Sequence, residues 1–298
     1  MKKIFFYLLI CSCTQFQVFA QCHIDDWTAL KALYQTTNGD NWDNNEGWEQ
    51  MEGEEPPINC DLSNIVGVIK MDEYEIRIEE LFLSGNNLVG RLPDEICKMV
   101  GLRKLGLSFN SLTMAIPNCI ENITELFHLL LDFNQLTGSI PPELGNLPNL
   151  SWLALTDNQL TGEIPPELGN LPLSRLELSG NQLTGNIPVE LATTGRRYVL
   201  RLSYNQLSGC IPPEFGDAFF DWTNLSIFEN NLSGCYDENL LKMCDPFDGV
   251  YGFINPFYLN DLDVTFEEFC FEGKGICDSG VGCRSEDSPP LVGTFNCD

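Results

Sequence analysis

The sequence has few basic residues. Its 298 residues include 16 Lys and Arg against 43 Asp and Glu, which gives a formal net charge of −27. A surface of this sign repels polyanions, so we expect no nucleic-acid partner and no anionic membrane partner. The acidity is explained by a solubilising surface, with weak binding of divalent cations as the alternative.

Groups that catalytic and metal sites need are also scarce. The chain has two histidines, His23 and His128, and neither lies in a nucleophile motif. The sequence contains no GxSxG, no HExxH, no phosphate-binding loop and no CxxC pair. Carboxylate pairs occur throughout so acidic a chain and therefore carry no information. We expect no enzyme activity, no cofactor and no metal centre.

Apolar runs long enough to span a bilayer are lacking too. The run from Ile4 to about Ile10 is too short for this. It follows two lysines and precedes VFA (Val18–Ala20), an order that predicts a signal peptide over residues 1–20. Lipidation of Cys11 is a weaker alternative, because bulky Ile10 stands where such sites need a small residue. We expect a secreted, extracellular protein, with a place at the cell surface left open.

A 24-residue repeat dominates what the sequence does contain. LTGSIPPELGNLPNL (Leu136–Leu150) returns 24 residues later as LTGEIPPELGNLP (Leu160–Pro172). The unit is LxxLxLxxNxLxGxIPxxLGNLxx, and its asparagine recurs at spacings of 24, 24, 24, 23, 24 and 25 residues. A motif with a fixed period predicts stacked coils of backbone, here about seven. The asparagines are Asn86, Asn110, Asn134, Asn158, Asn181, Asn205 and Asn230.

Each position of the unit has a physical role. The leucine pair predicts a short strand, and stacked strands make a parallel sheet. The asparagine should turn inward and satisfy backbone groups, and the glycine should permit a tight bend. Met114 stands where this glycine is expected, so its coil should bend differently. We expect an α/β solenoid: a right-handed superhelix with a parallel β-sheet on its concave face and disulfide-bearing caps.

The repeat resembles the leucine-rich repeat family in its 24-residue plant-type subclass, on the copies at Leu129–Leu147 and Leu153–Leu171. LKALYQTTNGDNWDNNEGW (Leu30–Trp48) is similar to the amino-terminal cap of secreted bacterial members. FEEFCFEGKGIC (Phe266–Cys277) is similar to a carboxy-terminal cap. The resemblance implies a binding scaffold, like the receptor ectodomains and the inhibitors of plant-wall hydrolases in this family.

Four regions follow from these patterns. They are a signal peptide (1–20), an N-terminal cap (21–75), the repeats (76–244) and a C-terminal cap with a Cys-rich acidic tail (245–298). In the N-terminal cap, Asp25 or Asp26 should precede a helix whose apolar residues face the repeats. These boundaries rest on where the repeat starts and stops.

Cysteine is abundant, and in a secreted chain it predicts disulfides. Eleven of the thirteen cysteines follow residue 20, so one is left over. Cys97 and Cys119 fall at the same corner of neighbouring coils, which predicts a bridge. Cys235 could pair with Cys210 or with Cys244, and the sequence leaves this open. The other candidates are Cys22 with Cys60, Cys270 with Cys277, and Cys283 with Cys297.

The concave face is the predicted binding site, because the core needs none of its outward side chains. Aromatic and basic side chains gather there, and these favour binding interfaces. We expect a non-catalytic module that binds a protein or a polysaccharide here. Phe109 and Phe133 also lie there, with packing over neighbouring coils as the simpler explanation. The predicted partner-binding residues are Phe82, Lys104, His128, Leu130, Trp152, Arg175, Arg201 and Phe228.

Two other columns support an alternative, a structural, adhesive, or ice-, mineral- or cation-binding protein. Ice binding would need one hydroxyl in register on each coil, and bound cations would need aligned acids. The hydroxyl column comprises Thr113, Thr137, Thr161, Thr184, Ser208 and Ser233, with Val89 at its start. The acidic column comprises Glu95, Glu143, Glu167, Glu190 and Glu214.

Overall fold

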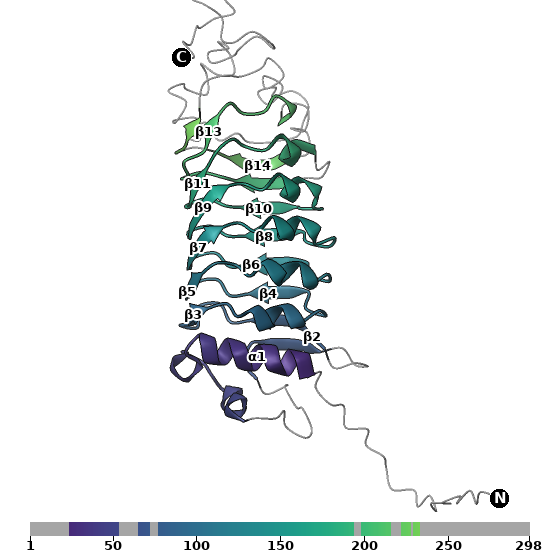
Figure 1. The fold of residues 1–298 in the computed structure, drawn as a ribbon, viewed down its shortest axis with the longest axis vertical. Coiled ribbons are helices and arrows are strands. Elements are labelled where there is room, and N and C mark those ends of the chain that lie inside the picture. The colour runs from purple at the N-terminus through teal and green to yellow at the C-terminus, as the bar shows by residue number, and fades with distance from the viewer. Residues whose placement is uncertain are drawn as a thin grey trace, which may run out of the picture.

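The computed structural model describes residues 24–53, 65–71, 77–193, 198–215, 222–227 and 229–232. Within them, one α-helix covers the first of a series of coils that stack along the long axis of the molecule (Figure 1). The predicted signal peptide and the predicted C-terminal cap and tail lie outside the described residues. The four region boundaries therefore remain predictions.

The leucine pairs form the main sheet, as the sequence predicts. Strand β1 pairs antiparallel with β2, and each later strand pairs parallel with the one a coil before it. The eight strands are, in sheet order, β1 (Val68–Met71), β2 (Ile78–Phe82), β4 (Lys104–Gly106), β6 (His128–Leu130), β8 (Trp152–Ala154), β10 (Arg175–Glu177), β12 (Tyr198–Arg201) and β14 (Trp222–Ser226).

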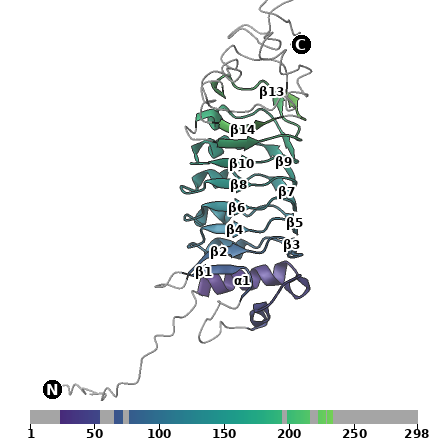
Figure 2. The same cartoon turned by 180° about the vertical axis from the view of Figure 1, so that it is seen from behind.

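A second parallel sheet follows the asparagines and runs along the other edge of the stack (Figure 2). The sequence did not predict it, because its strands are short and β3, β7 and β9 each contain a glycine, which disfavours strands unless neighbouring coils supply the pairing. Its five strands are β3 (Val89–Arg91), β5 (Ser111–Met114), β7 (Gln135–Ser139), β9 (Gln159–Glu163) and β11 (Gln182–Thr184). A separate pair joins β13 (Ser208–Gly209) to β15 (Asn231–Leu232).

Single-turn 3-10 helices close the coils opposite the main sheet and stack on one another. The repeated prolines supply the extended residue before each helix, as at Pro141 and Pro165. Gly145 and Gly169 allow close stacking, because a β-carbon on Gly145 would lie 2.7 Å from a backbone oxygen of the next coil, and one on Gly169 would lie closer still. The helices are η3 (Asp94–Lys98), η4 (Asn118–Asn122), η5 (Pro142–Asn146), η6 (Pro166–Asn170) and η7 (Val189–Thr193).

The core is a continuous column of leucine and isoleucine between the two sheets and the 3-10 helices. In β6 and just after it, for example, Leu129 and Leu131 are both fully buried. Burying each such side chain contributes about 1.5–3 kcal/mol, and each coil needs its neighbours to complete that burial. This explains why the unit is repeated.

The asparagines turn inward and connect neighbouring coils. Asn134 is 8% exposed, and its Nδ2 donates to the carbonyl oxygens of Leu107 and Leu131, each at 3.0 Å. Its Oδ1 accepts the backbone N–H of Leu112 at 3.0 Å. Equivalent bonds occur at the other members of the series, while Asn86 at its start bonds the backbone of Asn44 in the cap.

The predicted change of bend at Met114 is wrong. Met114 adopts a left-handed φ of 68°, in the same region as Gly138 and Gly162 at the equivalent positions. The coil therefore keeps its path and forces an unfavourable backbone conformation on a residue with a side chain. That side chain is 61% exposed and fills no part of the core.

Helix α1 (Ile24–Thr36) covers the end of the stack with Trp27, Leu30 and Leu33 buried. It begins at Ile24, so Asp25 and Asp26 lie in its first turn rather than before it. The Asp26 carboxylate instead reaches the repeats, where it accepts the backbone N–H of Ile78 at 2.9 Å and pairs with Arg77. The cap is thereby joined to β2 by a buried charged group.

An aromatic cluster completes the N-terminal cap. The rings of Tyr34, Trp42 and Trp48 pack with centroids 4.8–6.1 Å apart. Both indole N–H groups are satisfied, that of Trp42 by the carbonyl of Thr37 and that of Trp48 by the carbonyl of Val66. Two 3-10 helices, η1 (Gly39–Asn41) and η2 (Trp48–Glu52), complete this layer.

Candidate functional site

The site begins with a carboxylate on the outer face of the main sheet, which we call the β-face. Glu177 in β10 is 8% exposed although it points away from the core. Its Oε1 pairs with Arg201 Nη1 at 2.9 Å and with Arg175 Nη2 at 3.5 Å, and its Oε2 accepts the Trp152 indole N–H at 3.0 Å. Three strands therefore direct their side chains at one acid.

Trp152 is held on both sides. The Arg175 guanidinium lies over its ring, with Cζ 4.6 Å from the centroid. The His128 ring packs edge to face against the Trp152 ring, with 5.2 Å between their centroids. The Phe127 ring packs in turn against the His128 ring, with 4.8 Å between their centroids. We call Arg175, Glu177, Arg201, Trp152 and His128 the Trp152 cluster.

Strand register produces this order. Lys104, His128, Trp152 and Arg175 are direct partners on neighbouring strands, because successive leucine pairs align in the parallel sheet. Side chains from positions about 24 residues apart thus become neighbours. Lys104 in turn pairs with Glu80 at 3.1 Å.

The pKa of His128 lies below its ordinary value. Burial among the aromatic rings is the larger cause, and the positive charge of Lys104 adds to it, while Glu80 opposes both. His128 is therefore neutral in this site at neutral pH, and its imidazole offers both a donor and an acceptor to a ligand.

The other predicted site residues differ in their surroundings. Leu130 and Phe82 are half-buried, and the Phe82 ring lies over Gly106, where a β-carbon would clash with it. Leu130 aligns with Ala154 beside the Trp152 cluster. Phe82 lies on β2, at the other end of the sheet, and Phe228 lies outside the described residues. The structure therefore brings His128, Trp152, Arg175 and Arg201 together, with Lys104 and Leu130 next to them.

Glu177 and Glu80 were missed as site residues by sequence reasoning, which sought aromatic and basic side chains. The available signal was register: Glu177 aligns with Arg201 on one neighbouring strand and with Ala154 on the other, two residues after Trp152. An acid flanked by a guanidinium and an indole on neighbouring coils indicates a shared contact.

The edge of the β-face carries a second aromatic feature. Phe109 and Phe133 stack nearly parallel, with centroids 4.3 Å apart and an angle of 9°. They remain 58% and 42% exposed, so they pack on each other without being buried. Next along this edge, burial and the neighbouring Asp132 carboxylate raise the pKa of Asp157.

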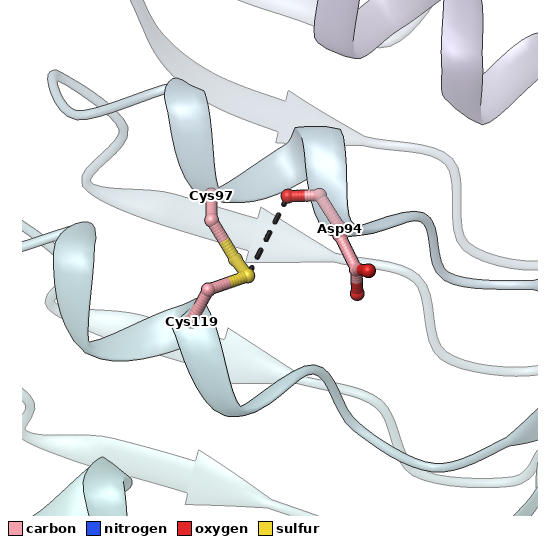
Figure 3. Close-up of a disulfide and its surroundings, with 3 residues drawn as sticks. All are labelled: Asp94, Cys97 and Cys119. Carbon is pink, nitrogen blue, oxygen red and sulfur yellow. Dashed lines mark hydrogen bonds between the residues drawn. A yellow bond between two sulfur atoms is a disulfide. The ribbon is translucent and has the colours of Figure 1, made fainter.

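Only three of the cysteines in the predicted pairs lie among the described residues: Cys97, Cys119 and Cys210. Cys97 in η3 and Cys119 in η4 form a disulfide, and Cys119 Sγ also lies 3.5 Å from the Asp94 carbonyl oxygen (Figure 3). Cys210 follows β13 and is partly exposed. The remaining predicted partners lie outside the described residues: Cys22, Cys60, Cys235, Cys244, Cys270, Cys277, Cys283 and Cys297.

Thr113, Thr137, Thr161 and Thr184 of the hydroxyl column lie on the second sheet, and Glu95, Glu143, Glu167 and Glu190 of the acidic column lie in the 3-10 helices. Several hydroxyls bond the preceding coil: Thr113 Oγ1 lies 3.0 Å from the Gly90 carbonyl, and Thr161 Oγ1 lies 3.4 Å from that of Gly138. Among the described residues, no group of three His, Cys, Asp or Glu side chains is placed to hold a metal ion. No described helix has the length and apolarity that a bilayer crossing requires.

A family model described as Leucine Rich Repeat matches residues 77–99, 125–147, 149–171, 172–193 and 198–218. No curated protein matches the chain by sequence. Among solved structures, the chain is similar to the ectodomain of the plant membrane receptor kinase GASSHO1/SCHENGEN3 from Arabidopsis thaliana, in complex with CASPARIAN STRIP INTEGRITY FACTOR 2. The identity is 36%, over 69% of this chain and 22% of that chain, with a TM-score of 0.54.

Two further structures extend the comparison. The ectodomain of the Arabidopsis receptor kinase HAESA, in complex with an IDA peptide hormone ligand, is 31% identical over 70% of this chain and 31% of that chain, with a TM-score of 0.54. A plant ice-binding protein is 26% identical over 76% of this chain and 85% of that chain, with a TM-score of 0.53. The chain spans less than a third of the two receptor ectodomains. The repeated sequence, its stacked strands and these matches together show that the coils are leucine-rich repeats, similar to those of plant receptor ectodomains.

Proposed function

We propose that this protein is a secreted, non-catalytic recognition module that binds a peptide or protein through the Trp152 cluster on the β-face. The observation that carries the proposal is the Trp152 side chain, half-buried and held by Arg175, Glu177 and His128. A fixed aromatic side chain loses little entropy when a partner packs against it. Tryptophan and arginine are also the residues that most often dominate binding energy.

Charge supports a polypeptide partner. Arg175 and Arg201 share one carboxylate, Glu177, so the cluster carries a local positive excess on a strongly acidic protein. Both guanidinium groups remain partly exposed and keep donors available for a partner's carbonyl or carboxylate oxygens. The HAESA structure shows a receptor ectodomain of this kind with a peptide hormone, which favours the same class of ligand here.

The hydroxyl column is the weaker candidate. A surface that orders water or mineral needs free hydroxyls in register, whereas Thr113 and Thr161 are within hydrogen-bond distance of the preceding coil. Those bonds give these two threonines a role in coil stacking. The chain is about as similar in structure to the receptor ectodomain of HAESA as to the plant ice-binding protein, with TM-scores of 0.54 and 0.53. Structural similarity therefore does not favour ice binding.

The test is capture of a partner from the medium surrounding the source organism. The immobilised protein is compared with a Trp152→Ala/Arg175→Ala variant and with a matched Thr137→Ala/Thr161→Ala variant of the second sheet. We expect the first variant to lose the captured polypeptide and the second to keep it, with melting temperatures close to that of the parent protein. Arg201 still neutralises Glu177 in the first variant, so the fold should persist.

Two outcomes would contradict the proposal. Capture that survives in the Trp152→Ala/Arg175→Ala variant would exclude the cluster as the site. Loss of capture only in the threonine variant, or thermal hysteresis that the threonine variant abolishes, would instead favour the second sheet. Capture of a polysaccharide that depends on Trp152 would support the proposed site but would show that the partner is a polysaccharide and not a polypeptide.

A further inference from the structure

One residue per coil takes a left-handed backbone where the chain leaves the main sheet. The φ values are 57° at Phe109, 54° at Phe133 and 62° at Gly85 in the coil before them. Backbone hydrogen bonds keep these positions aligned: Gly85 N donates to the Ser108 carbonyl, and Phe109 N donates to the Asp132 carbonyl. The three residues therefore form consecutive steps of one column.

Phe109 and Phe133 stand out in this column. A side chain at positive φ costs about 1–2 kcal/mol, and large exposed apolar groups add nothing to the core. Both rings are nevertheless present, stacked at 4.3 Å and accessible to solvent. Stacking with Phe133 occupies one face of the Phe109 ring, and the next position of the column on the other side of Phe109 is Gly85.

The position beside Phe109 is open. A β-carbon on Gly85 would meet no atom within 4 Å. Gly180, another glycine of the same column, differs, because there the Asp157 carboxylate occupies the place of the missing side chain. The column thus offers a slot over Gly85, next to the uncovered face of Phe109, for one more flat group.

Charge indicates which flat group fits. The face of an aromatic ring attracts cations, and the protein itself stacks the Arg175 guanidinium on Trp152. Exposed Asp43 lies near the slot along the backbone, since its N–H donates to the carbonyl of Asn86, the residue after Gly85. Asp132 lies on the far side, at the step before Phe133, and the whole chain has an excess of acids.

We propose that the slot formed by Gly85 and Phe109 binds the guanidinium group of an arginine in a basic partner segment. The guanidinium stacks on Phe109 and continues the ladder of rings, while the acidic surroundings neutralise its charge. This surface lies at the edge of the sheet and does not depend on the Trp152 cluster. It adds a second point of contact and specifies the chemistry of what binds there.

The test titrates the protein with a tetra-arginine peptide and follows the ring proton resonances of phenylalanine by NMR. Phe109→Ala removes the platform, and Gly85→Phe fills the slot with a ring of the protein's own. The second variant should fold, because Phe109 and Phe133 already carry rings at the same φ and a side chain at Gly85 meets open space. Tyr204→Ala, an exposed aromatic at another step of the column, is the matched control.

We expect Phe109→Ala and Gly85→Phe each to lower the affinity for tetra-arginine by about two- to fivefold, the worth of one exposed cation–π contact. Tyr204→Ala should leave the affinity unchanged, which shows that the loss is specific to the slot over Gly85. Asp43→Asn should weaken binding at low salt more than at high salt. Parent-like affinity in Gly85→Phe, or tighter binding of tetra-tyrosine or a neutral hexose than of tetra-arginine, would overturn the proposal.

Discussion

The guanidinium of Arg175 lies over the indole ring of Trp152, with 4.6 Å between Cζ and the ring centroid, and both side chains contact Glu177. The two residues are 23 positions apart, and the sheet makes them direct neighbours. A cation–π contact and a shared carboxylate therefore fix the orientation of Trp152 before any ligand arrives.

Glu177→Gln should loosen this arrangement. The amide keeps an acceptor for the Trp152 indole but loses the charge that pairs with Arg175 and Arg201. Because both guanidinium groups are partly exposed, we expect a loss of about 1 kcal/mol in the free energy of unfolding. Urea unfolding measures this, and Trp152 fluorescence should change at the same time. Glu163→Gln on the exposed side of β9 is the control, and an equal loss there would show that Glu177 has no special role.

The pKa of His128 provides a direct test of its surroundings. Proton NMR titration of the imidazole should give a pKa below the reference value of 6.5. Lys104→Gln should raise the pKa of His128, because it removes a neighbouring positive charge, and Glu80→Gln should lower it further. A pKa at or above 6.5 in the parent protein would contradict the described burial.

The same shift makes stability depend on pH. Well above pH 6.5 His128 is neutral in the folded and unfolded states. As the pH falls from 6.5 through the lower folded-state pKa, the unfolded state takes the proton first, so stability decreases and then levels off. Urea midpoints at about pH 8 and about pH 5 should therefore differ less in His128→Gln than in the parent. If the difference between the two urea midpoints were the same in His128→Gln as in the parent, groups other than His128 would cause the pH dependence.

Asn134→Ala should be among the most damaging substitutions in the repeats. It leaves the carbonyls of Leu107 and Leu131 and the N–H of Leu112 without these bonds in the core. With about 1–3 kcal/mol for each buried group left unsatisfied, we expect a loss of at least about 3 kcal/mol. Asn146→Ala, an exposed asparagine that bonds Glu121, should cost under about 0.5 kcal/mol by the same denaturation measurement. Similar losses at both positions would contradict the structural role of the series.

Met114→Gly should stabilise the protein. Met114 has a φ of 68° and is 61% exposed, so glycine would relieve backbone strain at little cost in buried area. We expect a gain of about 1 kcal/mol, reduced by the larger entropy of glycine in the unfolded chain. The reverse change, Gly138→Met, should destabilise by a similar amount, because Gly138 has a φ of 80°. Thermal denaturation of both variants checks the pair, and a destabilised Met114→Gly would refute the strain.

The sequence predicted the main sheet because its signals are periodic and local. A leucine pair and an asparagine that return at nearly constant spacing allow one stacking arrangement, and strands β2, β4 and β6 follow it. The Cys97–Cys119 disulfide was predictable for the same reason, since both residues occupy one corner of neighbouring coils. The second sheet was missed, because its strands pair only once the stack exists.

The sequence alone determined that the backbone coils, which side chains enter the core and which face remains free for contacts, because these depend on periodicity. Only the tertiary structure decided which side chains meet on that face. Register across strands placed Trp152, Arg175 and Glu177 in contact, and the position of the cap brought Asp43 toward Gly85. Such contacts join residues on different coils or on the cap, so their geometry depends on stacking rather than on local sequence.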